Sequence, residues 1–402
     1  MKHWPLCLLF VGLISSCSEN PQKKAQVLQE LNSPAAAGSG MPFLYSDGNQ
    51  TLLSWVEKQG DSLAILKYSE LSNESWKPAR EVMRGTDWFV NWADFPVITA
   101  NNGHLFTHVL KKSSAGTYSY DVRFNLLAKD ERSWRTDLPL HQDNTPTEHG
   151  FVTALPYEDG FFVNWLDGRN TVENEAGERG AMTIRAATLN LLGEIVTDTL
   201  LDARTCDCCQ TTAAITTNGP VVIYRDRSED EIRDISIVRQ LAGKWTTPKP
   251  IFEDHWKING CPVNGPKAAA MENALVVAWF TAAEDSAKIK LAFSDDGGAN
   301  FDNPIIVSDS KPMGRVDVAL IDKETAVVSW MESKDKKADL NVVQLSREGA
   351  RSKIHTITSV SAARASGFPQ MELVRDKFYF AWTAINDSTS IVKTAFIKTS
   401  DL

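Results

Sequence analysis

A short apolar segment ending in Trp, Tyr or His recurs along this chain every 51 to 59 residues. The seven copies are residues 51–55, 104–108, 161–165, 221–224, 275–279, 326–330 and 378–382. A fixed period of about fifty residues is typical of repeat proteins, in which each unit packs against its neighbours. The repeat therefore restricts the chain to a propeller or an array of similar units.

The surroundings of each copy predict three further strands. Around the fifth copy, residues 266–269 precede it, and residues 289–293 and 305–307 follow it. These segments are short, rich in β-branched residues and bounded by turn residues, as expected for four antiparallel strands in a propeller blade. The sequence thus predicts an all-β, seven-bladed β-propeller.

Ring closure can also be predicted from the two ends of the chain. The last repeat stops after its third strand, at residues 391–397. Residues 25–31 near the N-terminus are expected to supply the missing outer strand, because closure of the ring removes an unpaired sheet edge.

One turn between a third and a fourth strand carries a recognisable motif. Residues 294–301 read SDDGGANF, which matches the pattern S-x-D-x-G-x-x-W/F. The stretch resembles the Asp-box of sialidase-like (BNR) β-propellers. Its Asp accepts backbone N–H bonds, its Gly residues adopt strained dihedrals, and its aromatic residue packs between blades. Sialidases of that family have six blades, which makes six the alternative to seven here.

The N-terminus has the features of an export signal. Lys2 is followed by an apolar run at residues 6–14 and by Cys17. The sequence around Cys17 resembles the lipobox of bacterial lipoproteins, in which the cysteine is acylated. We expect a signal peptide at residues 1–16, a tether at 17–24 and one propeller domain at 25–402. Ser18, rather than Asp, favours an outer-membrane lipoprotein that faces the periplasm or the cell exterior.

Charge and hydropathy exclude two other classes of protein. The formal net charge is -9, so no basic character indicates nucleic-acid binding. After the leader, no apolar run of about 18 residues is present, so a membrane contact is expected only through the lipid anchor.

Besides Cys7 and Cys17, the chain has four cysteines, which occupy two unusual runs. Cys206, Cys208 and Cys209 lie in TCDCCQ, and Cys261 lies in NGCPVNG. Both runs precede the innermost strands of neighbouring repeats, so we expect the four sulfurs to cluster near the central channel. Disulfides are one interpretation, because exported cysteines are usually oxidised. A copper or zinc site, a redox element, a catalytic thiol and inert buried thiols are the alternatives.

Loops that lead into the innermost strands, and loops that join second to third strands, share one face of a propeller, which we call the loop face. Candidate ligand-binding residues fall on these loops: Arg169, Arg225, Arg227, Arg315 and Trp256. The candidate catalytic residues are Asp207, Asp226 and Tyr224. The sialidase resemblance implies three arginines for a carboxylate, a Tyr nucleophile paired with Glu, and an Asp acid/base. Residues 38–42 lack the Arg-Ile-Pro motif of that family.

The sequence therefore predicts a lipid-anchored propeller with a loop-face site for a glycan or a small anionic molecule. A glycoside hydrolase is the enzymatic version of this hypothesis. A cysteine-based metal-binding or redox propeller and a non-catalytic interaction scaffold are the alternatives.

Overall fold

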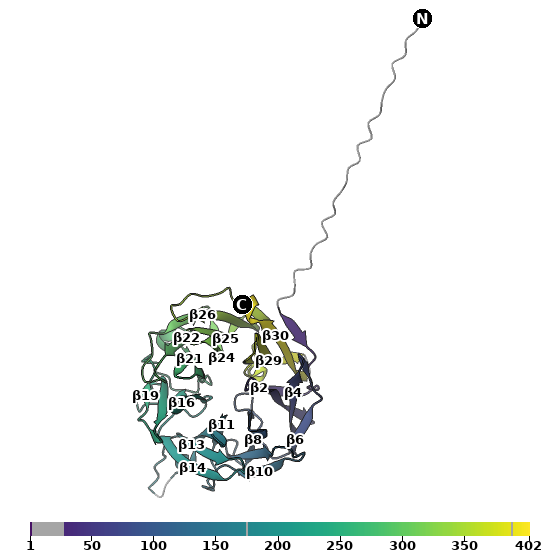
Figure 1. The fold of residues 1–402 in the computed structure, drawn as a ribbon. Helices are drawn as coiled ribbons and strands as arrows, with labels where there is room; N and C mark the ends of the chain where they lie inside the picture. Colours follow the sequence, from purple (N-terminus) through teal and green to yellow (C-terminus); the bar gives the residue numbers. More distant parts are fainter. Residues whose placement is uncertain (2–27, 174–175, 387–388) are drawn as a thin grey trace.

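The computed structural model describes residue 1 and residues 28–173, 176–386 and 389–402. These residues form seven antiparallel sheets arranged around a central axis (Figure 1). The prediction of a seven-bladed β-propeller is confirmed. The predicted signal peptide after Met1 and the predicted tether, which includes Cys17, lie outside the described residues.

In blades 1 to 4 the chain runs outward from the axis, so that the first strand of each blade is the innermost. Blade 1 contains β2 (Ser39–Ser46), β3 (Thr51–Gln59), β4 (Leu63–Ser72), β5 (Ser75–Trp76) and β6 (Arg80–Gly85). Blade 2 contains β7 (Ile98–Asn101), β8 (His104–Lys112), β9 (Tyr120–Leu127) and β10 (Arg135–Pro139). Blade 3 contains β11 (His149–Tyr157), β12 (Gly160–Asp167), β13 (Thr183–Asn190) and β14 (Ile195–Asp202). Blade 4 contains β15 (Thr212–Thr216), β16 (Gly219–Arg225), β17 (Ile235–Leu241), β18 (Lys244–Trp245) and β19 (Lys249–Pro250).

The remaining blades follow the same plan. Blade 5 contains β20 (Lys267–Met271), β21 (Ala274–Thr281), β22 (Lys288–Ser294) and β23 (Ile305–Ser308). Blade 6 contains β24 (Pro312–Asp322), β25 (Thr325–Lys334), β26 (Lys337–Ser346) and β27 (His355–Ser361). Blade 7 contains β28 (Gln370–Val374), β29 (Lys377–Asn386), β30 (Thr389–Lys398) and β1 (Gln29–Leu31).

Helical structure in the described part of the chain is limited to short 3₁₀ turns. They are η1 (Arg169–Thr171), η2 (Ala283–Asp285), η3 (Arg364–Ser366) and η4 (Thr399–Asp401). Within the described ranges, no helix has the length and hydropathy needed to cross a membrane.

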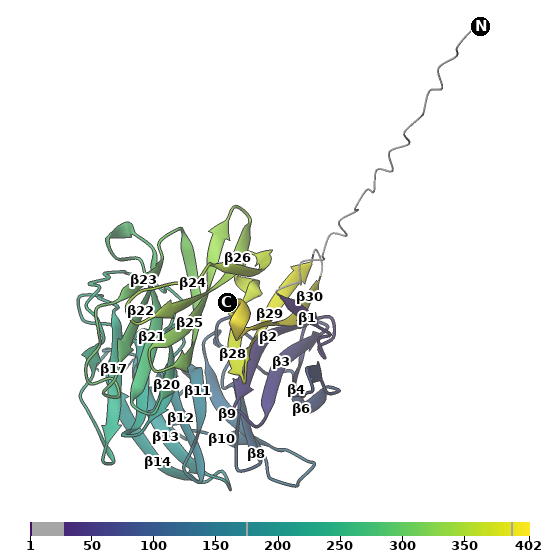
Figure 2. The same cartoon turned by 45° about the horizontal axis from the view of Figure 1, so that its top comes forward.

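The N-terminal strand closes the ring, as expected. β1 pairs antiparallel with β30, with Gln29 opposite Phe396 and Leu31 opposite Thr394 (Figure 2). The paired strand is shorter than the predicted segment 25–31, of which residues 25–27 lie outside the described residues.

The repeated apolar segments form the second strand of each blade, and most of their aromatic ends fill the spaces between blades. Trp55, Trp165, Trp279 and Trp330 are fully buried. Their burial removes large apolar surfaces from water, which accounts for an aromatic residue at this position of four repeats.

The Asp-box turn between β22 and β23 has the structure that its motif predicts. Ser294 Oγ donates to Asp296 Oδ1 at 2.9 Å, and Asp296 Oδ1 accepts the Asn300 N–H at 2.9 Å. Phe301 packs against the buried cluster between blades 4 and 5. Because strand direction alternates along a blade, this turn lies on the face opposite to the loop face.

Hydrogen bonds from residues of the innermost strands and their loops connect each blade to the next. At four junctions a side-chain oxygen accepts a backbone N–H of the following blade: Asp94 from Phe151 at 2.8 Å, Gln210 from Gly265 at 3.2 Å, Asn264 from Arg315 at 2.9 Å and Asp317 from Met371 at 2.8 Å. At the other three, Tyr45 donates to Ala100 O, Thr211 donates to Phe151 O, and Thr383 accepts from the Met41 N–H. We call these contacts the junction hydrogen bonds.

Two of these bonds require a glycine beside the acceptor. A Cβ at Gly150 would lie 2.0 Å from Asp94 Oδ2, and a Cβ at Gly314 would lie 2.1 Å from Asn264 Oδ1. The glycines therefore allow the acceptor side chain of one blade to reach the backbone of the next.

Gly314→Ala should destabilise the ring more than Gly349→Ala does. Both glycines have nearly the same positive φ, 84° and 86°, but no atom lies within 4 Å of a Cβ built at Gly349. The two variants share the backbone strain, and only Gly314→Ala also displaces Asn264. We expect Gly314→Ala to cost about 1–3 kcal/mol more free energy of unfolding in urea titrations. Equal losses would show that the junction does not require a glycine.

Candidate functional site

The molecule contains a central channel of about 610 Å³ lined by the innermost strands. The wall is mainly Ala, Val, Leu and Phe, with a few charged groups such as Lys267, Asp317 and Glu372. Near the loop face, Phe95, Phe151 and Phe368 pack together from blades 2, 3 and 7. Phe95 and Phe151 also line the channel, so aromatic rings form part of its wall near the loop face.

A second cavity, which we call the loop-face cleft, has a volume of about 550 Å³ and lies over blades 2 to 4. It is lined by residues of the loops that lead into β11 and β15 and of the loops that follow β8, β12 and β16: Tyr118, Pro146, Thr147, Glu148, Thr171, Val172, Glu173, Arg179, Gly180, Ala181, Met182, Asp207 and Arg227. Two of the residues predicted from the sequence as site residues, Asp207 and Arg227, line this cleft.

Glu148 is one of the ionisable residues that line the loop-face cleft. Tyr120 Oη donates a hydrogen bond to Glu148 Oε1 at 2.6 Å and lies 3.4 Å from Asp94 Oδ2. Burial raises the pKa of Glu148 to about 7, and the negative charge of Asp207 and Cys206 adds to the rise. Burial and the two neighbouring acids also raise the pKa of Tyr120, which keeps its phenol protonated as a donor.

Asp207 faces the same cleft from the loop that leads into β15. Arg227 Nη1 donates to Asp207 Oδ2 at 2.9 Å, and its Nη2 donates to Glu231 Oε1 at 2.7 Å. Burial raises the pKa of Asp207, while the Arg227 cation opposes the rise. The cleft lining therefore holds three carboxyl groups, Glu148, Glu173 and Asp207. Asp207 is paired with Arg227 and Glu173 with Arg179 at 3.7 Å, whereas burial is the main influence on Glu148.

A buried ion-pair network lies directly behind Glu148. His149 Nδ1 lies 3.2 Å from the carbonyl oxygens of Tyr120 and Thr147, and its Nε2 lies 3.3 Å from Asp143 Oδ1. Burial opposes protonation of His149, but Asp143 and Asp167 outweigh it and raise its pKa. The two carboxylates therefore favour the protonated form of the imidazole at the start of β11.

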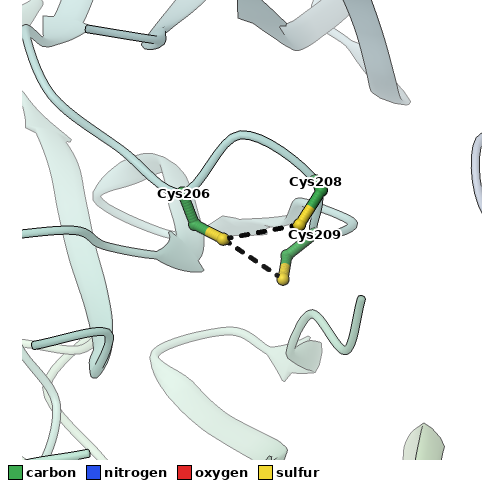
Figure 3. Close-up of side chains that lie close together, drawn as sticks. All are labelled: Cys206, Cys208 and Cys209. Atoms are coloured by element: carbon green, nitrogen blue, oxygen red, sulfur yellow. Dashed lines mark hydrogen bonds between the residues drawn. The ribbon is translucent and has the colours of Figure 1, made fainter. Parts of the chain in front are cut away.

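The cysteine cluster lies next to the cleft. Cys206 Sγ lies 3.9 Å from Cys208 Sγ and 3.5 Å from Cys209 Sγ, and the three side chains point toward one another (Figure 3). Cys206 and Cys209 are buried and Cys261 is exposed; all four cysteines of the described residues are free thiols. Hydrogen bonds with the Cys208 and Cys209 thiols lower the pKa of Cys206 well below its usual range.

The predicted clustering of sulfurs is thus observed for the three residues of the TCDCCQ run. The neighbouring Cys208 thiol lowers the pKa of Cys261. Neither the disulfides nor the metal site is decided by this geometry, so both stay predictions.

Two of the predicted catalytic residues lie away from the cleft lining. Tyr224 is buried and donates to Asp202 Oδ2 at 2.6 Å. Asp226 accepts hydrogen bonds from the Arg227 N–H and from Ser236 Oγ, and burial raises its pKa to about 6. Asp207 is therefore the one member of the predicted catalytic set that the structure places in the loop-face cleft.

Among the predicted ligand-binding residues, Arg225 and Trp256 form a buried structural unit. The Arg225 guanidinium donates to the carbonyl oxygens of Asn264, Arg233 and Phe280 and lies 4.8 Å from the Trp256 ring centroid. Because its guanidinium nitrogen atoms donate to backbone carbonyl oxygens, Arg225 holds the loops of blades 4 and 5 together.

Arg169 and Arg315 are also engaged within the protein. Arg169 donates to both carboxylate oxygens of Asp167, at 2.7 and 2.6 Å. Arg315 is buried over the Trp92 ring, 5.2 Å from its centroid, and burial lowers its pKa to about 10. Of the predicted arginines, only Arg227 lines the cleft, and the ligand-binding roles stay predictions.

Sequence reasoning missed Tyr120 and Glu148 as a pair. The two residues are 28 positions apart and come from different blades, so no local motif connects them. Their positions held a usable clue, because Tyr120 begins a third strand and Glu148 precedes a first strand. Both positions belong to the loop face in a propeller.

No protein-family model matches the chain, and no curated protein matches its sequence. Solved structures share its fold. A polysaccharide lyase aligns at 8% identity over 89% of this chain and 89% of its own, with a TM-score of 0.52. The endosialidase of phage phi92 aligns at 9% identity over 92% of this chain and 68% of its own, with a TM-score of 0.50. At such low identity these similarities establish a common propeller fold alone.

Replacing Glu148 should change how stability depends on pH. A carboxyl whose pKa rises from 4.5 to about 7 on folding binds protons more tightly in the folded state. Its ionisation therefore destabilises the fold progressively as the pH rises through that window. We expect the wild type to lose roughly 3 kcal/mol of unfolding free energy relative to Glu148→Gln between pH values of about 4 and 8. A difference between the two proteins that is constant over this range would contradict the assignment.

Proposed function

We propose that the loop-face cleft binds an oligosaccharide and hydrolyses a glycosidic bond, with Glu148 as the general acid. The observation that carries this proposal is a cleft-lining carboxyl group with a pKa of about 7 and a fixed hydrogen-bond donor behind it. A carboxylic acid that retains its proton near neutral pH is the group that acid catalysis requires.

Asp207 supplies the second carboxyl group. Its ion pair with Arg227 favours the carboxylate of Asp207, whereas burial favours the protonated form of Glu148. Most glycoside hydrolases use two carboxyl groups in one cleft, one of which is protonated and one ionised.

The proposed reaction assigns one proton transfer to each group. The Glu148 carboxyl donates its proton to the glycosidic oxygen as the bond from that oxygen to the anomeric carbon breaks. The Asp207 carboxylate accepts a proton from the water molecule that attacks the anomeric carbon. The products are a hemiacetal and an alcohol, and proton exchange with solvent restores both carboxyl groups.

Tyr120 has a positioning role in this proposal. Its ring is fully buried and stacks on Phe89 with centroids 4.2 Å apart, so the phenol reaches Glu148 rather than the cleft. The sialidase resemblance implies a Tyr paired with a Glu, and Tyr120 with Glu148 is such a pair. Its burial favours support of the acid over attack on the substrate.

The fold is consistent with this proposal. Two structures that share the fold, at TM-scores of 0.52 and 0.50, are named as a polysaccharide lyase and an endosialidase. The proposed location is the outer membrane, through a lipid on Cys17, which would place the cleft in contact with extracytoplasmic glycans.

Glu148→Gln should abolish most hydrolysis while preserving binding. The amide retains an oxygen for the Tyr120 hydrogen bond but has no proton to donate at neutral pH, so we expect kcat to fall by about a hundredfold or more. The measurement is release of reducing ends from a panel of neutral and acidic oligosaccharides. In the wild type, kcat/KM should fall as the pH rises above about 7, because Glu148 then loses its proton.

Glu158→Gln is the matched control, because Glu158 is exposed in the β11–β12 turn on the opposite face. It should retain wild-type activity. If no oligosaccharide on the panel is cleaved, or if Glu148→Gln is as active as Glu158→Gln, the proposal is wrong.

A further inference from the structure

Cys206, Cys208 and Cys209 converge on one point beside the loop-face cleft, although the proposed hydrolysis does not use them. One ligand atom from each residue lies within 4.8 Å of the other two. A metal ion with thiolate ligands at about 2.3 Å holds neighbouring sulfurs roughly 3.8 Å apart. The distances from Cys206 Sγ, 3.5 and 3.9 Å, therefore already approach those of a metal–thiolate site.

The loop that carries these sulfurs is held at both ends. The Cys206 N–H donates to Arg225 O at 3.1 Å. Gln210 Nε2 donates to Ala93 O at 2.6 Å, and Gln210 Oε1 accepts the Gly265 N–H. Contacts with blades 2, 4 and 5 thus fix the loop, which lowers the conformational cost of gathering three ligands.

A cationic side chain beside the sulfurs favours a negatively charged thiolate site. Arg233 Nη1 donates to Cys206 Sγ at 3.3 Å, and Arg233 is buried. Arg233 Nε is buried without a hydrogen-bond partner among the described residues. Donors next to ligand atoms orient the ligands and balance their charge in metal sites.

We propose that Cys206, Cys208 and Cys209 bind one thiophilic d10 metal ion, either Cu(I) or Zn(II). Thiolate sulfur selects these ions over the harder divalent metals. Cys261 stands at the rim of the site, because it is exposed and reaches the cluster through Cys208. Cys261 is therefore not one of the three proposed metal ligands, Cys206, Cys208 and Cys209, which we call the triad. A disulfide would consume two of the sulfurs, so oxidation of the triad is the competing outcome.

Metal binding to the whole chain tests this directly. Protein purified under nitrogen with reduced thiols is titrated separately with Cu(I) against bicinchoninate and with Zn(II) against 4-(2-pyridylazo)resorcinol. We expect the protein to bind one equivalent of at least one of the two ions in competition with the chelator. The two titrations show which ion it binds. X-ray absorption of the loaded protein should show sulfur neighbours at about 2.3 Å.

Variants separate the triad from its surroundings. Cys206→Ser and Cys209→Ser should each weaken binding by about a hundredfold or more, and Arg233→Gln by about tenfold. Cys261→Ser is the matched control and should keep one equivalent with less than about a tenfold loss. Glu148→Gln should bind metal as the wild type does, so a failure of the hydrolysis proposal leaves this one intact.

Three results would overturn the metal site. The first is no competition with either chelator, and the second is a first shell of nitrogen and oxygen atoms only. The third is a triad disulfide, seen by intact mass, that forms in the presence of both ions. The X-ray absorption spectrum of the metal-loaded wild type tests the proposal without any variant, so the test holds even if a serine variant fails to fold.

Discussion

The junction hydrogen bonds are the contacts on which the rest of this structure depends. A propeller blade buries its aromatic residues only against its neighbours, so the position of each blade must be fixed relative to the next. Here an acceptor such as Asp94 or Asp317 reaches a backbone N–H in the following blade. Because buried acceptors without partners are costly, each bond also sets the distance at which two blades pack.

The candidate site is built from the same residues that hold the ring together. Asp94 accepts the Phe151 N–H and also lies beside Tyr120, which orients Glu148. Gln210 connects blade 4 to blades 2 and 5 and ends the loop that carries the cysteines. Rigid blade junctions therefore position both the acidic cleft and the sulfur cluster, which explains their neighbouring places on the loop face.

The sequence was sufficient to predict the fold because its strongest pattern is periodic. The apolar segments, the Asp-box turn and the closure by β1 follow from strand period and turn chemistry within short windows. The clustering of Cys206, Cys208 and Cys209 followed as well, because they lie close in sequence. The Tyr120–Glu148 pair could not be predicted from the sequence, nor could the hydrogen bonds that the Arg225 guanidinium makes to backbone carbonyl groups. Both depend on how different blades pack together. Residue type and loop position alone do not distinguish an arginine that holds two loops together from an arginine that binds a ligand.

Hydrogen–deuterium exchange in the presence of an oligosaccharide that the protein binds tests the central claim most directly, because it locates the ligand without assuming a reaction. The account predicts slower exchange at residues 145–149 and 205–209, which line or adjoin the loop-face cleft. It predicts unchanged exchange at the Asp-box turn, residues 294–301, on the opposite face. Protection confined to that opposite face, with none at Glu148 or Asp207, would contradict the account.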